Sequence, residues 1–209
     1  GEMPVQVKTA RAKHEEKDKL LSLITPTADY ADLAGCDLVV EAVFEESAVK
    51  KAATEKAEAV LKSSAVFASN TSTIPITALA KNSTRPKNFI GIHFFSPVDK
   101  MMLVEIILGK KTGDKALATA IDFVRAIKKT PIVVNDTRGF YVNRCVLRYM
   151  SEAYKMLIEG VPAPMIDNAA KAAGIPVGPL ALTDETAIDL AQKIMKQPIR
   201  YLGDKSIDH

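Results

Sequence analysis

The chain has 209 residues, of which 47% are apolar and 25% charged, and its formal net charge is +3 at pH 7. This balance is typical of a globular protein and excludes a disordered chain, which would have fewer apolar residues and a larger net charge. No segment of the sequence approaches the roughly 20 consecutive apolar residues that a membrane span needs. Basic and acidic residues are interspersed along the chain, so the charge pattern argues against a nucleic-acid partner.

The first two thirds of the chain alternates short apolar runs with helical stretches. The helical stretches are expected at residues 8–23, 46–62 and 114–128. The apolar runs, which are rich in Val, Ile and Phe, are expected to be strands at 37–43, 65–69, 88–95, 102–108 and 131–134. Short strands between helices are typical of βαβ units and predict a parallel sheet. We therefore expect an α/β domain over residues 1–136.

The remainder of the chain, residues 137–209, is expected to form an all-α domain. After a turn-rich segment at 135–139, helices are predicted at 140–159, 163–173 and 179–197. The first of these helices carries two adjacent apolar stripes, which together are wider than one buried face. That band predicts either a central helix of the domain or a contact between subunits, so a homodimer through the helical domain is one expected outcome.

Cys36 and Cys145 are the two cysteines of the chain, and they stand far apart in the sequence. Their spacing matches neither a zinc site nor a redox pair, and it fits a protein of a reducing compartment. We expect a cytoplasmic protein without a metal site.

His93 and Glu105 are the two residues most suggestive of chemistry. His93 lies in the apolar segment FIGIHFFSP, and Glu105 interrupts the otherwise apolar strand MLVEIIL. A buried carboxylate without a partner is costly, so Glu105 should have one, and His93 is the nearest candidate if the two strands are neighbours. A carboxylate beside an imidazole fixes its tautomer and makes its other ring nitrogen a better base.

Two purely structural explanations compete with this interpretation. His93 can be a buried histidine that hydrogen-bonds to the backbone. Glu105 can instead form a salt bridge with a nearby lysine, such as Lys100, Lys110 or Lys111.

Polar residues follow the predicted strands at the edge where ligands of open α/β sheets collect. The cluster Ser69–Thr73 can donate hydrogen bonds to a ligand or simply form a capped turn. Glu41 and Glu45 bracket another strand end, where they can accept hydrogen bonds from sugar hydroxyls or lie in solvent near a helix start. Asn143, in the first turn of the long helix, can bind a ligand or satisfy the backbone.

Six motifs occur in an order that resembles one enzyme family. They are DLVVEAVFE (37–45), FASNTSTIPI (67–76), FIGIHFFSPV (89–98), MMLVEII (101–107), DTRGFYVNR (136–144) and GIPVGPLALTDE (174–185). Together they resemble the L-3-hydroxyacyl-CoA dehydrogenase family, and most of all the dehydrogenase part of the multifunctional fatty-acid oxidation proteins that also carry an enoyl-CoA hydratase. This resemblance implies a Rossmann-type NAD-binding domain followed by a helical domain. It also implies NAD-dependent oxidation of (S)-3-hydroxyacyl-CoA to 3-oxoacyl-CoA in fatty-acid β-oxidation.

The resemblance further implies roles for individual residues. His93 corresponds to the general base and Glu105 to the residue that orients it. Ser72 and Asn143 correspond to the residues that hold the substrate hydroxyl and the acyl-CoA carbonyl region. The positions that contact NAD in the family are occupied here by Val43, Phe44, Glu45, Lys50, Ser72 and Ser96. Ser96 departs from the asparagine found in many members of the family.

The glycine turn G-x-G-x-x-G, which holds the cofactor pyrophosphate in this family, does not occur among the ten glycines of the sequence. The resemblance begins within the helical segment that follows the family's second strand and stops short of the family's C-terminal end. We therefore expect an incomplete NAD-binding domain with weak affinity for NAD. The alternatives are a catalytically silent fragment that acts as a self-associating scaffold, and a β-hydroxyacid dehydrogenase that uses a lysine base.

Overall fold

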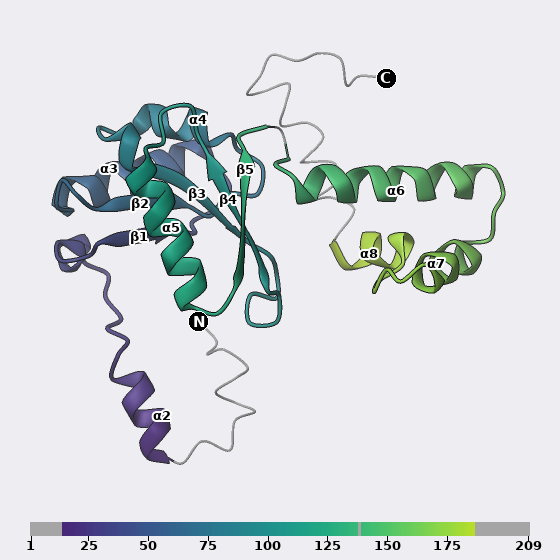
Figure 1. Cartoon of the computed structure of the whole chain (residues 1–209), viewed down its shortest axis with the longest axis horizontal. Coiled ribbons are helices and arrows are strands. Elements are labelled where there is room, and N and C mark those ends of the chain that lie inside the picture. Colours follow the sequence, from purple (N-terminus) through teal and green to yellow (C-terminus); the bar gives the residue numbers. More distant parts are fainter. Residues whose placement is uncertain (1–13, 138, 187–209) are drawn as a thin grey trace.

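The computed structural model describes residues 14–137 and 139–186. Within these residues, five strands form one sheet in the order β1-β2-β3-β4-β5 (Figure 1). The strands are β1 (Leu38–Glu41), β2 (Val66–Ser69), β3 (Phe89–Phe94), β4 (Leu103–Leu108) and β5 (Thr130–Asn135). Each strand overlaps one of the apolar runs of the sequence, so all five strand predictions are confirmed.

The sheet is mixed rather than wholly parallel, which corrects the sequence prediction. The pairs β1–β2, β2–β3 and β4–β5 are parallel, whereas β3 and β4 are antiparallel. Only the eight residues 95–102 join β3 to β4. A crossover to a parallel neighbour needs about a dozen residues or more, so this short connection forces β4 to run back along β3.

Helices cover both faces of the sheet (Figure 1). The helices described in residues 14–137 are α2 (His14–Leu21), α3 (Ser47–Val60), α4 (Ile76–Leu79) and α5 (Asp114–Ala126), with the 3₁₀ helices η1 (Tyr30–Leu33), η2 (Ala80–Asn82) and η3 (Pro86–Asn88). The predictions of α3 and α5 are confirmed, and residues 8–13 of the first predicted helix lie outside the described residues. The shorter helices were not predicted, because three or four residues are too few to show a helical period.

Strand alternation divides the apolar side chains between two cores. On the face covered by α3 and α4, Phe67 of β2, Phe89 of β3 and Ile107 of β4 are buried together. On the face covered by α5, the strands contribute Val66, Ala68, Ile90, Ile92, Val104 and Ile106. Because successive side chains of a strand point to opposite faces, the odd-numbered residues of β3, including His93, lie on the α3 and α4 face.

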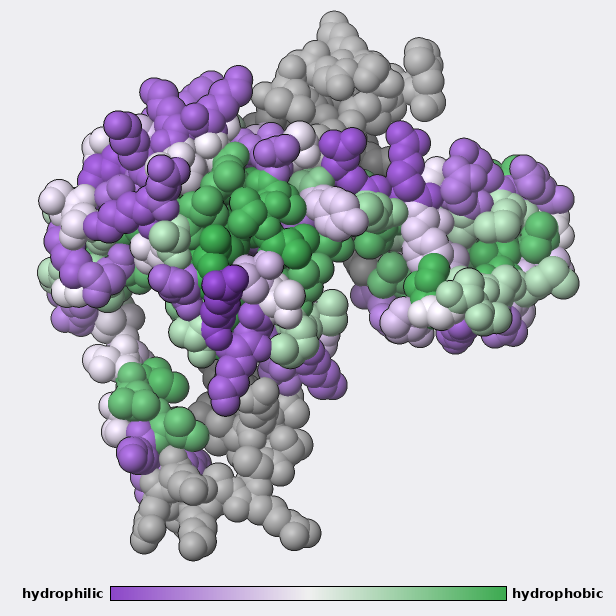
Figure 2. All heavy atoms as spheres, viewed as in Figure 1, coloured by the Kyte–Doolittle hydropathy of each residue, from purple (hydrophilic) through white to green (hydrophobic). Residues whose placement is uncertain are grey.

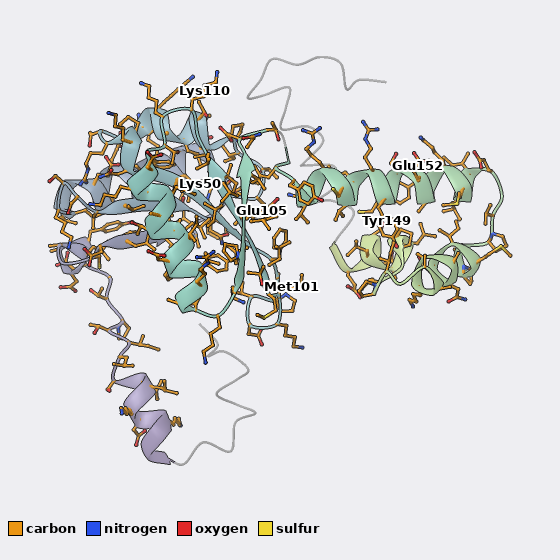
Figure 3. The ribbon with its side chains drawn as sticks, in the orientation of Figure 1. Lys50, Met101, Glu105, Lys110, Tyr149 and Glu152 are labelled. Carbon is orange, nitrogen blue, oxygen red and sulfur yellow. The ribbon has the colours of Figure 1, made fainter. Side chains whose placement is uncertain are left out.

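Three helices follow the sheet: α6 (Val142–Ile158), α7 (Ala163–Ala172) and α8 (Pro179–Thr186). They pack on one another, and the Asp167 carboxylate of α7 accepts hydrogen bonds from the backbone N–H groups of Leu180 and Ala181 at the start of α8. Figure 3 shows Tyr149 pointing from α6 toward α8, where its hydroxyl donates to the carbonyl of Val177. The part of the predicted helix at 179–197 that follows Thr186 lies outside the described residues.

The apolar band of α6 is only partly covered. Met150 and Ala153 are its buried residues within the described part of the chain. Leu157 is 45% exposed and Ile158 is 85% exposed, and Figure 2 shows apolar residues at the surface of this helical part. Within the described residues, α6 is therefore not enclosed on all sides, which leaves the subunit-contact alternative as a prediction.

No helix in residues 14–137 or 139–186 is long and apolar enough to cross a bilayer.

Candidate active site

The polar residues predicted from the sequence gather at one edge of the sheet. Glu41, Ser69 and His93 lie at or next to the carboxyl ends of β1, β2 and β3, and these ends meet because the three strands are parallel. All three residues are buried. Open α/β sheets bind their ligands at this edge, so the fold places these residues where a ligand site is expected.

His93 and Glu105 form a buried pair. They lie directly opposite each other in the antiparallel register of β3 and β4. The imidazole Nδ1 and the carboxylate Oε2 are 2.8 Å apart, and the two residues are 4% and 0% exposed. The structure therefore brings together the two side chains that the sequence singled out, and the partner of Glu105 is this imidazole rather than a lysine.

The second oxygen of Glu105 is bound by the start of α6. Its Oε1 accepts hydrogen bonds from the backbone N–H groups of Tyr141 and Val142, at 2.9 and 2.8 Å. These groups have no partner within the helix, because the first N–H groups of a helix lack an acceptor one turn earlier. Glu105 thus links the imidazole on β3 to the first turn of α6.

These contacts keep Glu105 ionised. Burial raises the pKa of Glu105, but the hydrogen bonds from His93, Val142 and Tyr141 outweigh it, so the pKa lies below the ordinary value for a glutamate. An ionised carboxylate only accepts hydrogen bonds, so Nδ1 of His93 must carry a proton. The neutral imidazole therefore has Nε2 as its free acceptor.

Two aromatic rings hold the imidazole from its sides. The ring of Phe95 lies 4.5 Å and that of Phe140 lies 5.9 Å from the imidazole, between ring centres. Gly139 and Phe140 both have positive φ angles, +68° and +51°. Glycine adopts this conformation without strain, whereas for Phe140 it is unfavourable and is offset by burial of its ring, which leaves the residue 1% exposed.

Ser72 and Asn143 are also brought together, although they are 71 residues apart in sequence. The Asn143 side-chain Nδ2 donates to the backbone carbonyl of Ser72 at 3.0 Å. Ser72 itself is exposed at the sheet edge. In the same turn, the Thr71 hydroxyl accepts from the N–H of Ile74, so the turn is capped by one of its own residues as one alternative predicted.

Glu41 and Lys50 form a buried ion pair beneath this edge. The Lys50 Nζ lies 2.8 Å from Oε1 of Glu41, and the two residues are 1% and 6% exposed. Oε2 of Glu41 accepts from the Ser69 hydroxyl at 2.7 Å. Glu41 is therefore not the solvated carboxylate of one alternative, because it is buried and protein donors bind both of its oxygens.

Glu45 turns back toward the loop after β2. Its Oε1 lies within hydrogen-bonding distance of the N–H groups of Ser72 and Thr73 and of the Thr71 and Thr73 hydroxyls, and its Oε2 lies 3.3 Å from the Lys50 Nζ. Burial raises the pKa of Glu45, but the hydrogen bond from Thr71, the charge of Lys50 and the hydrogen bonds from Thr73 outweigh it and lower the pKa overall.

The other residues at the family's cofactor positions lie at the surface of the same edge. Phe44 is 85% exposed and Val43 is 37% exposed. Ser96 is exposed in the connection that follows β3. An exposed aromatic ring and an exposed valine beside a polar loop form a surface that a nucleotide can cover.

Sequence reasoning missed several residues that support the site. Asn70 accepts from the N–H of Phe94 through its Oδ1, which ties the end of β3 to the loop after β2. The roles of Phe95 and Phe140 were also not foreseen. The available signals were Asn70 within the polar cluster and Phe95 within the FIGIHFFSP segment, whereas nothing local to Phe140 indicates that it meets His93.

Two family models match the chain. Residues 2–137 match the NAD binding domain of 3-hydroxyacyl-CoA dehydrogenase, and residues 139–208 match its C-terminal domain.

The chain belongs to the 3-hydroxyacyl-CoA dehydrogenase family. Its fold is accordingly a Rossmann-type NAD-binding domain followed by a helical C-terminal domain, and the cofactor of the first domain is NAD. A fatty acid oxidation complex subunit alpha from Shewanella amazonensis is 44% identical over 199 residues. That match covers 95% of this chain but 28% of the relative, so the chain spans less than a third of the length of such curated relatives.

Solved structures of the family share the fold. The (S)-3-hydroxybutyryl-CoA dehydrogenase PaaH1 from Ralstonia eutropha is 34% identical and superposes with a TM-score of 0.88, over 97% of this chain and 72% of that one. The dehydrogenase part of multifunctional enzyme 1 from C. elegans is 30% identical with a TM-score of 0.65, over 92% of this chain and 45% of that one.

Proposed function

We propose that this chain carries out the NAD-dependent oxidation of (S)-3-hydroxyacyl-CoA to 3-oxoacyl-CoA in fatty-acid β-oxidation. The observation that carries the proposal is the buried pair of His93 and Glu105 at the ligand-binding edge of the sheet, next to Ser72 and Asn143. Family membership and the names of the relatives support the same reaction.

In this proposal His93 is the general base. An alcohol carbon releases a hydride only as its hydroxyl proton leaves, and an imidazole with an ordinary pKa of about 6.5 can accept that proton near neutral pH. The proton goes to Nε2, because Nδ1 already donates to Glu105. The ionised Glu105 then stabilises the imidazolium that forms and holds its ring in place.

Ser72 and Asn143 hold the substrate in this proposal. The main chain of Ser72 is occupied at both its N–H and its carbonyl, by Glu45 and Asn143. Its hydroxyl has no hydrogen-bond partner within the part of the chain that the structure describes, so it can donate to the substrate oxygen as negative charge develops there. The amide of Asn143 keeps its carbonyl oxygen and one N–H for the acyl-CoA carbonyl region.

The cofactor would lie along the same edge, against Val43, Phe44, Ser72 and Ser96. When bound, NAD accepts the hydride from the alcohol carbon, which is chemistry that the cofactor itself supplies. Glu45 and Lys50 lie at this edge as well, with their charged groups turned toward the protein. Phe44 can cover an apolar face of the cofactor, because its ring is largely exposed next to a polar loop.

We further propose that the boundary between the two domains lies at residues 136–137. We also propose that the protein is cytoplasmic, and that it forms a homodimer through the helical domain. The matches of the two family models on either side of residue 138 support the boundary. The free Cys36 and Cys145 support a reducing compartment. The exposed apolar residues of α6 support self-association.

The assay that tests the reaction compares a CoA thioester with the matching free acid. Formation of NADH, followed by its absorbance, is expected with (S)-3-hydroxybutyryl-CoA and not with free 3-hydroxybutyrate. Turnover of the free acid without turnover of the thioester would favour a lysine-dependent β-hydroxyacid dehydrogenase, although Lys50, the lysine nearest this edge, is ion-paired and buried. Absence of both activities would favour the scaffold alternative.

A further inference from the structure

Lys50 is among the most completely buried side chains of the described residues. It lies in the first turn of α3 and is 1% exposed, and its Nζ lies 2.8 Å from Glu41 Oε1, 3.3 Å from Glu45 Oε2 and 3.4 Å from the carbonyl of Val43. An ammonium group has three hydrogens to donate, and these three acceptors account for all of them. A buried lysine in this arrangement has no donor left for a ligand, although its position in the family pattern is a cofactor position.

Glu45 connects this buried lysine to the loop that carries Ser72. One of its oxygens faces Lys50, and the other faces the N–H groups of Ser72 and Thr73 and the hydroxyls of Thr71 and Thr73. The side chain of Glu45 is 32% exposed and that of Lys50 is 1% exposed, so Lys50 is the buried end of this connection and holds the carboxylate from the side opposite the loop.

We propose that Lys50 is a positioning residue: together with Glu41 it fixes Glu45, and Glu45 in turn sets the position of the Ser72 turn. The proposal rests on the proposed function for the meaning of Ser72, and it goes beyond it by giving Lys50 and Glu45 the task of holding the turn that carries this residue.

The geometry of Ser72 explains why such positioning matters. Glu45 holds the Ser72 N–H from the sheet side, and Asn143 holds the Ser72 carbonyl from the first turn of α6. The peptide that carries the hydroxyl is thus fixed at both ends by side chains from different parts of the chain. A displacement of about 1 Å in such a group costs on the order of 100-fold in rate, because the reacting atoms must meet in one geometry.

The test uses Glu45→Ala and Lys50→Met in the purified protein, with Glu46→Ala as the matched control. Glu46 is the next residue of the same loop, is exposed and makes no side-chain cap contact with α3, so its removal changes the charge equally without touching the Ser72 turn. We expect kcat with (S)-3-hydroxybutyryl-CoA to fall about 10- to 100-fold in Glu45→Ala and Lys50→Met. Glu46→Ala should retain wild-type values.

Amide hydrogen exchange supplies a readout that does not depend on activity. The amides of Ser72 and Thr73 should exchange faster in Glu45→Ala and Lys50→Met than in the wild type and in Glu46→Ala. If Lys50→Met fails to fold, Glu45→Ala still decides, because Glu45 is partly exposed and lies outside the two apolar cores.

The outcomes separate this inference from the proposed function. A higher KM for NAD with unchanged kcat and unchanged exchange would show cofactor contact and overturn the inference, while the reaction itself would stand. Faster exchange of Ser72 and Thr73 in a protein that does not oxidise the thioester would uphold the positioning of the turn and overturn the proposed reaction.

Discussion

At the scale of single residues, the role of His93 as general base can be tested by substitution. Replacing His93 by alanine removes the only group at the edge whose free nitrogen can accept a proton within the described residues, so we expect turnover of the thioester to fall by roughly 10² to 10⁴. Steady-state measurement of kcat checks this expectation. Near wild-type turnover in a folded His93→Ala protein would contradict the assignment of the base.

Glu105→Gln tests the carboxylate with little change of shape. The amide cannot stabilise the imidazolium as a negative charge does, so the limb of the pH–rate profile that reports on the base should move to lower pH, together with a loss of kcat. Measurement of kcat/KM between about pH 5 and 9 reveals the shift. A profile identical to that of the wild type would leave Glu105 with a purely structural role.

The ionised Glu105 also makes the stability of the wild type depend on pH, and Glu105→Gln removes this dependence. Because the pKa of Glu105 in the folded protein is lowered from the ordinary value of 4.5, the ionised carboxylate stabilises the fold above pH 4.5, and this contribution is lost as the pH falls through the folded-state pKa. The free energies of unfolding of the wild type and of Glu105→Gln should therefore differ most near neutral pH and converge in acid. Urea unfolding at several pH values measures this difference.

At the scale of secondary-structure elements, the packing of β3 against α4 requires a glycine. A Cβ atom on Gly91 would lie 2.7 Å from the side chain of Ile76 in α4 and 3.0 Å from the Cβ of Ile107 in β4. Both isoleucines are fully buried, so neither can move away easily. Gly91→Ala is therefore expected to destabilise the protein by about 1 to 3 kcal/mol through overpacking.

Urea unfolding of Gly91→Ala beside Gly35→Ala checks this prediction. A Cβ on Gly35 meets no atom within 4 Å, so that variant should differ little from the wild type. Equal stability of the two variants would mean that α4 can shift away from the sheet.

Long-range caps also join elements that lie far apart in the sequence. The Asp136 carboxylate, just after β5, accepts the N–H groups of Ile76 and Thr77 at the start of α4, from about 60 residues further along the chain. The start of α4 is therefore capped by a carboxylate that follows β5, and the start of α6 by the Glu105 carboxylate of β4.

At the scale of the whole molecule, the helical part is expected to mediate self-association. Leu157, Ile158 and Met165 are 45%, 85% and 61% exposed on α6 and α7. Exposed apolar groups gathered on one part of a protein favour an interface. Sedimentation equilibrium should show a dimer at micromolar concentration, and a monomer throughout the accessible concentration range would contradict this prediction.

The sequence alone determined the α/β and helical parts, the five strands, and the selection of His93 and Glu105 as a pair, because apolar periodicity and isolated polar residues in apolar segments are local signals. Ser72 and Asn143 were selected by the resemblance of their motifs to the family. Only the tertiary structure decided the antiparallel pairing of β3 with β4, the burial of Lys50 and the capping of α6 by Glu105. The antiparallel pairing follows from the short connection at 95–102, whereas the burial of Lys50 and the capping of α6 depend on which donors and acceptors remain unsatisfied once distant segments meet.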